Sequence, residues 1–405
     1  MRKAIVYCIY GMAFLLPLFP NIADLLLLVA FVMAIAHYLF STKEEREKSS
    51  RGARVATVFL YAYGIWSALS IFNSKAPYFS SFNWLYMVGM GLGIYQLSKH
   101  YVTTEDIQKK FFGVAIGGGI ITCLYGLYVY SGIPIVETKE WVDSAQFPLL
   151  QRRMYSTLQN PNLMGLYLLE LLAITSPLAL LWKKVEKTWL WWSASILFFI
   201  CLLLTYSRGV WIAFALMVVY WGFKVEKRLF WSLFVIPVVL FYYRGGIATR
   251  LWSLFESGDT SVSLRYALWD STWAMVQDHP LLGVGWGDYF ITYPFYNYFI
   301  QDPEVVIYHA HNMYLHLAAT IGIPGVVFFV AFLMLFAYTA ARIDNRYCQQ
   351  NFKCILNPIY SYGMPAMILA ILISGVTDYN LFSHQLSLIT WQFLGVGMAA
   401  IVDKD

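Results

Sequence analysis

Twelve apolar stretches run through the chain, and short polar segments separate most of them. Each stretch approaches the roughly 20 mostly apolar residues that a helix needs to cross a lipid bilayer. The pattern therefore predicts an all-α polytopic membrane protein with about twelve transmembrane helices, organised as a single transmembrane domain over 1–405. The expected spans are 3–20, 22–40, 55–71, 80–98, 110–130, 161–182, 188–205, 209–223, 229–243, 321–341, 357–376 and 384–402.

Two connections are much longer than the others: 131–160, and 244–320 between the ninth and tenth spans. Long loops in a compact bundle are commonly functional, so the candidate chemistry is expected there. The larger loop contains a stretch, 263–277, in which apolar residues recur at helical spacing. We expect a helix lying in the membrane interface and anchored by tryptophan. Its apolar residues are Leu264, Leu268, Trp269, Trp273 and Val276.

Composition agrees with a lipid environment, because 59% of the residues are hydrophobic, 18% aromatic and only 13% charged. Soluble domains carry about 25% charged residues, so this class is excluded. With the N-terminus in the cytoplasm, most of the 28 Lys and Arg residues fall in cytoplasmic loops, as the positive-inside rule requires. Both termini are then cytoplasmic and the two long loops face outside. The net charge of +5 is thus a topology signal, and no nucleic-acid partner is predicted.

The outer segments offer no convincing cofactor or metal motif. The glycines at 283, 285 and 287 are not a dinucleotide fingerprint, because no strand precedes them and they face away from the cytosol. Asp302 and Glu304 flank a proline, and such a pair is typical of a solvated loop. We predict no cofactor and no metal.

Three of the seven histidines, His309, His311 and His316, lie just before the expected tenth span. Their spacing does not place them on one helical face, which disfavours a zinc cluster. A neutral imidazole can accept a proton from a sugar hydroxyl near neutral pH. For His309 and His316, a supporting or interfacial position is the favoured interpretation.

Two arginines belong to the same outer side. Arg208 sits in a polar break, 206–209, between two apolar stretches, and Arg265 lies beside Trp269 on the expected interfacial helix. Each can anchor the protein to lipid phosphate. Together, two guanidiniums can also bind a pyrophosphate bidentately and neutralise it as it leaves. With one histidine, this set suits the transfer of a glycan from a polyprenyl pyrophosphate carrier.

At this point the motifs resemble those of the O-antigen ligase and O-antigen polymerase superfamily. His311 and Asn312, nine further residues, then Gly322-x-x-Gly325 are similar to the H-N-x9-G-x-x-G signature. The blocks 206–209 and 278–285, and Arg265 with Trp269, are similar to the same family, over about 150–330.

The resemblance implies a large membrane glycosyltransferase of the GT-C type, inverting and metal-independent, in the bacterial cytoplasmic (inner) membrane. It implies that His311 is the general base and that Arg208 and Arg265 hold the donor, a glycan linked to undecaprenyl pyrophosphate. The acceptor would be another glycan or a lipid-A core, and the active site would lie on the periplasmic face.

A second tier of residues is expected to contact substrate or support the base. The block 153–165, which begins at Arg153 and includes Asn160 and Asn162, resembles one branch of the superfamily. Helix capping by Asn162 is the alternative there. Asp378, in an outer turn, is expected to orient His311 or to pair with an arginine. The remaining members of this tier are Asn312 and His309.

Three functions remain open. A ligase and a surface polysaccharide polymerase would use the same donor and base, and nothing in the sequence identifies the acceptor. Transport of bicarbonate or of the lipid-linked glycan is an alternative of another class, because Glu170 is a carboxylate inside the expected sixth span.

Overall fold

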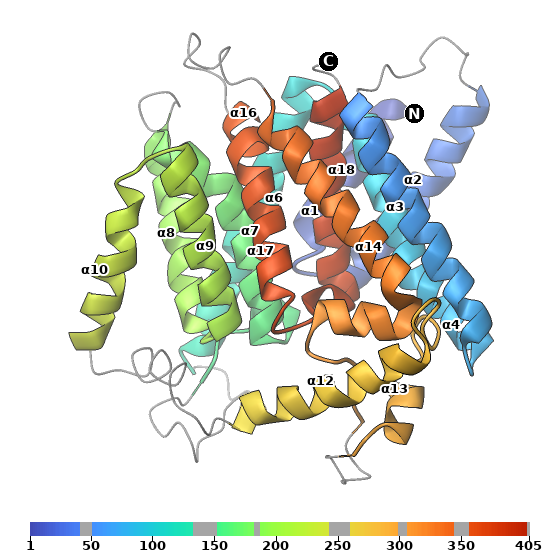
Figure 1. Ribbon diagram of the computed structural model, residues 1–405. Helices are drawn as coiled ribbons and strands as arrows, with labels where there is room; N and C mark the ends of the chain where they lie inside the picture. Colours follow the sequence, from blue (N-terminus) through green and yellow to red (C-terminus); the bar gives the residue numbers. More distant parts are fainter. Residues whose placement is uncertain are drawn as a thin grey trace.

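A computed structural model describes residues 1–40, 51–132, 152–181, 187–242, 260–298, 306–343 and 356–402. Within these ranges all regular structure is helical. Figure 1 shows long helices side by side, with both termini at one end of the bundle and helices α12 (Thr260–Asp278) and α13 (Tyr289–Thr292) at the other. We call the end that carries α12 and α13 the outer end. The predicted loop residues 133–151, 243–259 and 299–305, with Asp302 and Glu304, lie outside the described residues.

All twelve predicted apolar stretches coincide with helix. In chain order the helices are α1 (Arg2–Leu15), α2 (Pro20–Phe40), α3 (Arg51–Leu69), α4 (Pro77–Trp84) continued by a π-helical turn and α5 (Met90–Tyr101), α6 (Glu105–Tyr130), α7 (Pro161–Leu180), α8 (Thr188–Leu204), α9 (Arg208–Lys224), α10 (Leu229–Tyr242), α14 (Met313–Ala341), α16 (Leu356–Pro358) continued by a π-helical turn and α17 (Met364–Ser374), and α18 (His384–Val402).

Six helical segments among the described residues are long and apolar enough to cross a membrane. The fold is therefore that of a polytopic membrane protein, while a total of twelve spans stays a prediction. The six segments are Pro20–Leu39, Ala53–Asn73, Glu105–Tyr130, Pro161–Leu180, Met313–Ala341 and Leu356–Ser374.

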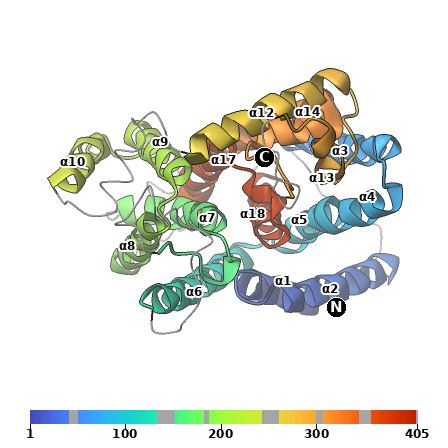
Figure 2. The same cartoon turned by 90° about the horizontal axis from the view of Figure 1, so that it is seen from below.

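The bundle has a buried centre and an apolar periphery. Helix α7 is buried along nearly its whole length, between α8, α9 and α17. Helix α2 instead leaves large apolar side chains exposed, among them Leu25, Val32 and Ile35. In water such a surface would be costly, whereas lipid tails solvate it as well as a protein core does. Figure 2, which views the outer end, shows α7, α17 and α18 inside the outline and α2 and α10 at its edges.

Helix α14 bends at Gly322, and this bend explains the G-x-x-G motif. The φ of Gly322 is +76°, in the region that favours glycine, and a side chain there would overlap the carbonyl of Leu281. Gly283, with φ +67°, is equally close to the backbone of α14, and the Val284 N–H donates to the Ala319 carbonyl at 2.8 Å. The loop after α12 is therefore seated directly on the bend.

The helix predicted at 263–277 is confirmed as α12, and it lies across the outer end beside α14 (Figure 2). Leu268 and Val276 are buried against the protein. The indole N–H of Trp269 donates to the Ala310 carbonyl at 3.1 Å, while Trp273 is half exposed. Trp269 thus fixes α12 to the segment that carries the histidines, and anchoring of this helix in the membrane interface stays a prediction.

The tenth span was predicted to begin at 321, and this position falls at the bend of α14 at Gly322, where two helical segments meet. The first segment was not predicted: it begins at Met313, because Asn312 caps it, and its polar residues His316 and Thr320 are buried by protein. His311 consequently precedes the helix, so the argument about helical faces does not apply to it.

Candidate active site

The His311–Asn312 motif stands where the chain enters α14. The side-chain oxygen of Asn312 accepts a hydrogen bond from the Leu315 N–H at 3.0 Å, a standard N-cap. Its Nδ2 donates to the Val376 carbonyl at 3.0 Å. One asparagine therefore starts the helix and ties it to the turn after α17. His311 itself has a φ of +47°, a strained value for a non-glycine residue that is commonly kept at functional sites.

This tie places Asp378 beside His311. Nδ1 of His311 lies 3.2 Å from Oδ1 of Asp378, and the same oxygen accepts from the Tyr379 N–H at 2.8 Å. A carboxylate in this position holds Nδ1 as the protonated nitrogen and leaves the lone pair on Nε2. The His311 side chain is 38% exposed and that of Asp378 only 11%, so the base is accessible and its partner is not.

Asp378 is held in its ionised form. Its burial alone would raise the pKa of the carboxyl, but the hydrogen bond from His311 and the electrostatic interactions with His311, His309 and Arg265 outweigh burial and lower that pKa. The anion can therefore orient the imidazole and stabilise it when it takes up a proton.

A relay of hydrogen bonds continues from Asp378 to the start of α7. Asn162 Nδ2 donates to Asp378 Oδ2 at 2.6 Å, and Arg153 donates to Asn162 Oδ1 at 3.0 Å. The Nε of Arg153 also donates to the Thr205 carbonyl at 2.8 Å. Asn160, not Asn162, caps α7, since its Oδ1 accepts from the Asn162 N–H at 2.8 Å. The capping interpretation therefore belongs to Asn160, and Asn162 supports Asp378.

Arg208 begins α9 next to this relay. The preceding Tyr206 has a φ of +52°, which produces the sharp break between α8 and α9. Gly209 packs so closely against Thr377 that a Cβ would overlap the threonine hydroxyl. The first turn of α9 thus lies against the turn that carries Asp378, and a helix N-terminus there is itself favourable for an anion.

Arg265 approaches the site from α12. Its positive charge acts on both Asp378 and His309, lowering the pKa of each. The Trp269–Ala310 hydrogen bond holds α12 in this position. All nine predicted site residues therefore gather at the outer end, from the segment before α7, the starts of α7 and α9, α12, the start of α14 and the turn after α17.

His309 lies beside His311, whose N–H donates to His309 Nδ1 at 3.2 Å. Desolvation, followed by the charge of His311, lowers the pKa of His309 to about 4, so it is neutral at physiological pH. His309, His311 and Asp378 also offer ligand atoms that all lie within 4.8 Å of one another. Such a set could hold a divalent ion, so metal independence stays a prediction.

His316 takes the supporting position that the sequence favoured, although the sequence did not reveal its partners. It is buried between the rings of Tyr289 and Tyr379, with both centroids 4.8 Å from its own. Its sandwich connects α13 and the Asp378 turn to α14. The only sequence signal for the packing of His316 was its closeness to His309 and His311 in the chain.

The apolar helical bundle and the charged, hydrogen-bonded cluster at its outer end define an integral membrane protein with a polar site at one end. Residues 193–330 match the family model Wzy_C, described as O-antigen ligase, and this match supports the O-antigen ligase superfamily. The matched segment includes Arg208, Arg265, His309, His311 and Asn312, and it supports a function of the O-antigen ligase or polymerase type in general. No curated protein matches the chain.

Proposed function

We propose that this protein is an inverting, metal-independent glycosyltransferase of the GT-C type. It transfers a glycan from undecaprenyl pyrophosphate to an acceptor hydroxyl, in the manner of an O-antigen ligase, at the outer face of the bacterial cytoplasmic membrane. The His311–Asp378 pair carries the proposal, because it presents an oriented and accessible imidazole. The segment that matches the family model adds two arginines, Arg208 and Arg265, at the same end of the bundle.

In this mechanism Arg208 and Arg265 bind the donor pyrophosphate, and the polyprenyl chain lies among the helices. Nε2 of His311 takes the proton of the acceptor hydroxyl while that oxygen attacks the anomeric carbon. The bond from the anomeric carbon to the pyrophosphate oxygen breaks, and its electron pair leaves with undecaprenyl pyrophosphate. The guanidiniums stabilise the charge that accumulates on this leaving group.

The buried carboxylate of Asp378 supports His311 in this mechanism. When His311 becomes an imidazolium, the ionised carboxylate 3.2 Å away stabilises it. Asn162 and Tyr379 keep both carboxylate oxygens occupied, so the anion does not turn toward the donor and repel its phosphates.

Polymerase activity is the alternative with the same donor chemistry. Purified protein given lipid-linked oligosaccharide alone distinguishes the two. We expect no product until a separate acceptor is added, and then a single transfer. A ladder of longer lipid-linked products would identify a polymerase, and no glycan transfer under either condition would contradict the proposal.

Transport was the other alternative, and it rested on Glu170. Oε1 of this buried carboxyl group accepts a hydrogen bond from the Thr390 hydroxyl at 2.5 Å. The contact joins α7 to α18, which supports a structural role within the bundle. Flux of labelled bicarbonate in proteoliposomes that disappears in Glu170→Gln would favour transport instead.

A further inference from the structure

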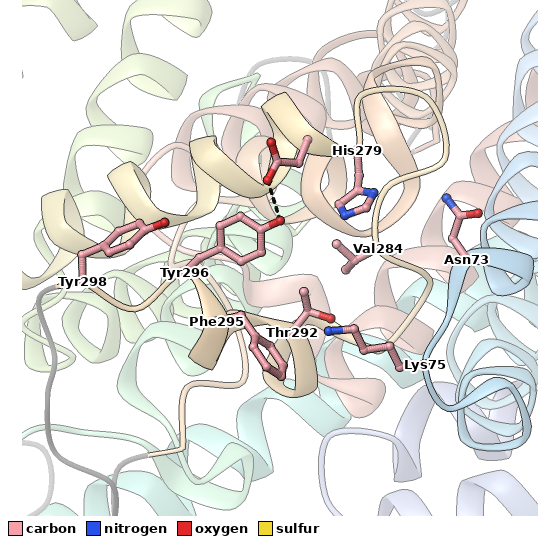
Figure 3. A pocket seen from close by; sticks show the side chains of 9 residues that line it. Asn73, Lys75, His279, Val284, Thr292, Phe295, Tyr296 and Tyr298 are labelled. Carbon is pink, nitrogen blue, oxygen red and sulfur yellow. Dashed lines mark hydrogen bonds between the residues drawn. The ribbon is translucent and has the colours of Figure 1, made fainter.

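A pocket of about 380 Å³ opens at the outer end, between the end of α12, the segment around α13 and the residues just before α4. It is separate from the His311 cluster and shares no residue with it. Figure 3 shows its side chains converging on one space, with Asn73 and Lys75 on one side and Phe295, Tyr296 and Tyr298 on the other.

The lining combines exposed aromatic rings with hydrogen-bonding groups. Phe295 and Tyr298 are 70% and 63% exposed. The hydroxyl of Tyr296 donates to Asp278 Oδ2 at 2.7 Å, and Lys75 Nζ lies 4.0 Å from the centre of the Phe295 ring. Flat rings beside fixed polar groups suit a saccharide, since the C–H face of a sugar stacks on a ring while its hydroxyls take hydrogen bonds.

The charges of the pocket favour a neutral ligand. Lys75 contributes one positive charge and Asp278 one negative charge among the lining residues. The pocket therefore has none of the cation excess that a pyrophosphate needs, whereas Arg208 and Arg265 supply that excess at the His311 cluster. A sugar unit fits the balanced lining better than a phosphate does.

The pocket is also held in shape before any ligand arrives. Asp288 is fully buried, and its carboxylate accepts from the Lys75 N–H at 2.5 Å and from the Ser80 hydroxyl at 2.9 Å. Asn73 Nδ2 donates to the Gly283 carbonyl at 3.0 Å. These bonds fix the segment before α4 against the α12–α13 connection. Ligand binding therefore loses little conformational entropy in ordering the pocket.

Helix α12 relates the pocket to the candidate active site. Arg265 and Asp278 belong to this one helix, and the stretch between them measures about 20 Å along its axis at 1.5 Å per residue. Figure 1 shows α13 beyond α12, on the side away from the bundle. A glycan bound by its pyrophosphate at the arginines and running along α12 reaches the pocket after several sugar units.

We infer that this pocket binds a saccharide unit of the glycan substrate, remote from the reacting carbon. The inference rests on the proposed function, because that function explains why a glycan is present. Binding of the glycan can nevertheless be measured without any transfer. The saccharide belongs either to the donor glycan or to the acceptor glycan. Separate binding measurements with each glycan distinguish the two sources.

The test uses the full-length protein with Phe295→Ala and Tyr298→Ala combined, in a His311→Ala background that prevents turnover. Tyr78→Ala is the matched control, because Tyr78 is a 93% exposed aromatic residue on α4 outside the pocket. The probes are lipid-linked oligosaccharide extracted from the source cells, undecaprenyl pyrophosphate without sugar, and the acceptor glycan released from its anchor.

We expect the double variant to bind a glycan-bearing probe about tenfold more weakly, as the loss of two stacking rings predicts. Undecaprenyl pyrophosphate without sugar should bind as it does to the control. Weaker binding of the lipid-linked oligosaccharide assigns the pocket to the donor, and weaker binding of the free acceptor assigns it to the acceptor. Equal binding of both glycan probes to variant and control, or equal weakening of the sugar-free lipid, would overturn the inference.

Tyr296→Phe is a milder second variant, which removes only the hydroxyl that donates to Asp278. It should weaken the same glycan probe by a smaller factor and leave the sugar-free lipid unaffected. If glycan transfer fails in the wild-type protein while these binding differences remain, the proposed function is wrong and the saccharide pocket stands.

Discussion

Two His–Asp pairs lie within the described residues, and they differ in exposure and in backbone setting. His311 and Asp378 are 3.2 Å apart, and His384 and Asp24 are 3.0 Å apart. The His311 side chain is 38% exposed, but that of His384 is only 10% exposed and Tyr86 stacks on it with the ring centres 3.6 Å apart. An imidazole covered by a tyrosine cannot meet an incoming hydroxyl.

The backbone around the two pairs differs as well. His384 is the first residue of α18 and pairs with the first turns of α2, so its contact joins two helix ends. His311 lies outside a helix at a positive φ and its carboxylate partner is supported by Asn162. The distance does not separate the two pairs, whereas access, backbone strain and support of the carboxylate favour His311–Asp378 as the proposed catalytic pair.

Arg208→Lys should have the largest effect among the changes that leave both pairs intact. A lysine keeps the charge but loses the planar fork that binds two phosphate oxygens. We expect the turnover number in the glycan-transfer assay to fall by about 100- to 1000-fold, as when one stabilising donor is removed from a transition state. Arg342→Lys, on the opposite end of α14, is the control. Turnover close to wild type in Arg208→Lys would mean that Arg208 only anchors the helix.

Asp378→Asn should cost less, about 10- to 100-fold in turnover, because it weakens the support of a base that is still present. Asp24→Asn tests the comparison directly, because the same change in the other pair should leave turnover close to wild type. An equal loss of turnover in both variants would remove the distinction between the pairs.

Removal of divalent ions should have the smallest effect. Extensive treatment with EDTA is expected to leave transfer unchanged, because the proposed chemistry needs only protein groups. His309, His311 and Asp378 are close enough to bind an ion, so the assay is informative. Loss of turnover that a divalent ion restores would reassign these three residues from proton transfer to metal binding.

The sequence predicted the helices well because lipid makes the apolar runs unambiguous. It missed the segment of α14 before the bend at Gly322, where polar side chains are buried by protein rather than excluded by lipid. The π-helical turns at 85–89 and 359–363 also had no signal in the apolar pattern.

For the site, the sequence indicated the candidate residues but not how they connect. Asn162 and Asp378 form one bond although they are 216 positions apart, and no spacing rule relates them. The sequence alone could not show that Asn160, rather than Asn162, caps α7. The pocket at Phe295 and Tyr296 could not be predicted, because three separate segments make it and the block 278–285 supplies only part of its lining.

The most direct measurement is glycan transfer by purified His311→Ala, with and without added imidazole, alongside donor binding. We predict a loss of about 100- to 10,000-fold in turnover with donor affinity unchanged, and partial recovery when imidazole replaces the missing base. Undiminished turnover in His311→Ala without imidazole would contradict the central claim that this histidine removes the acceptor proton.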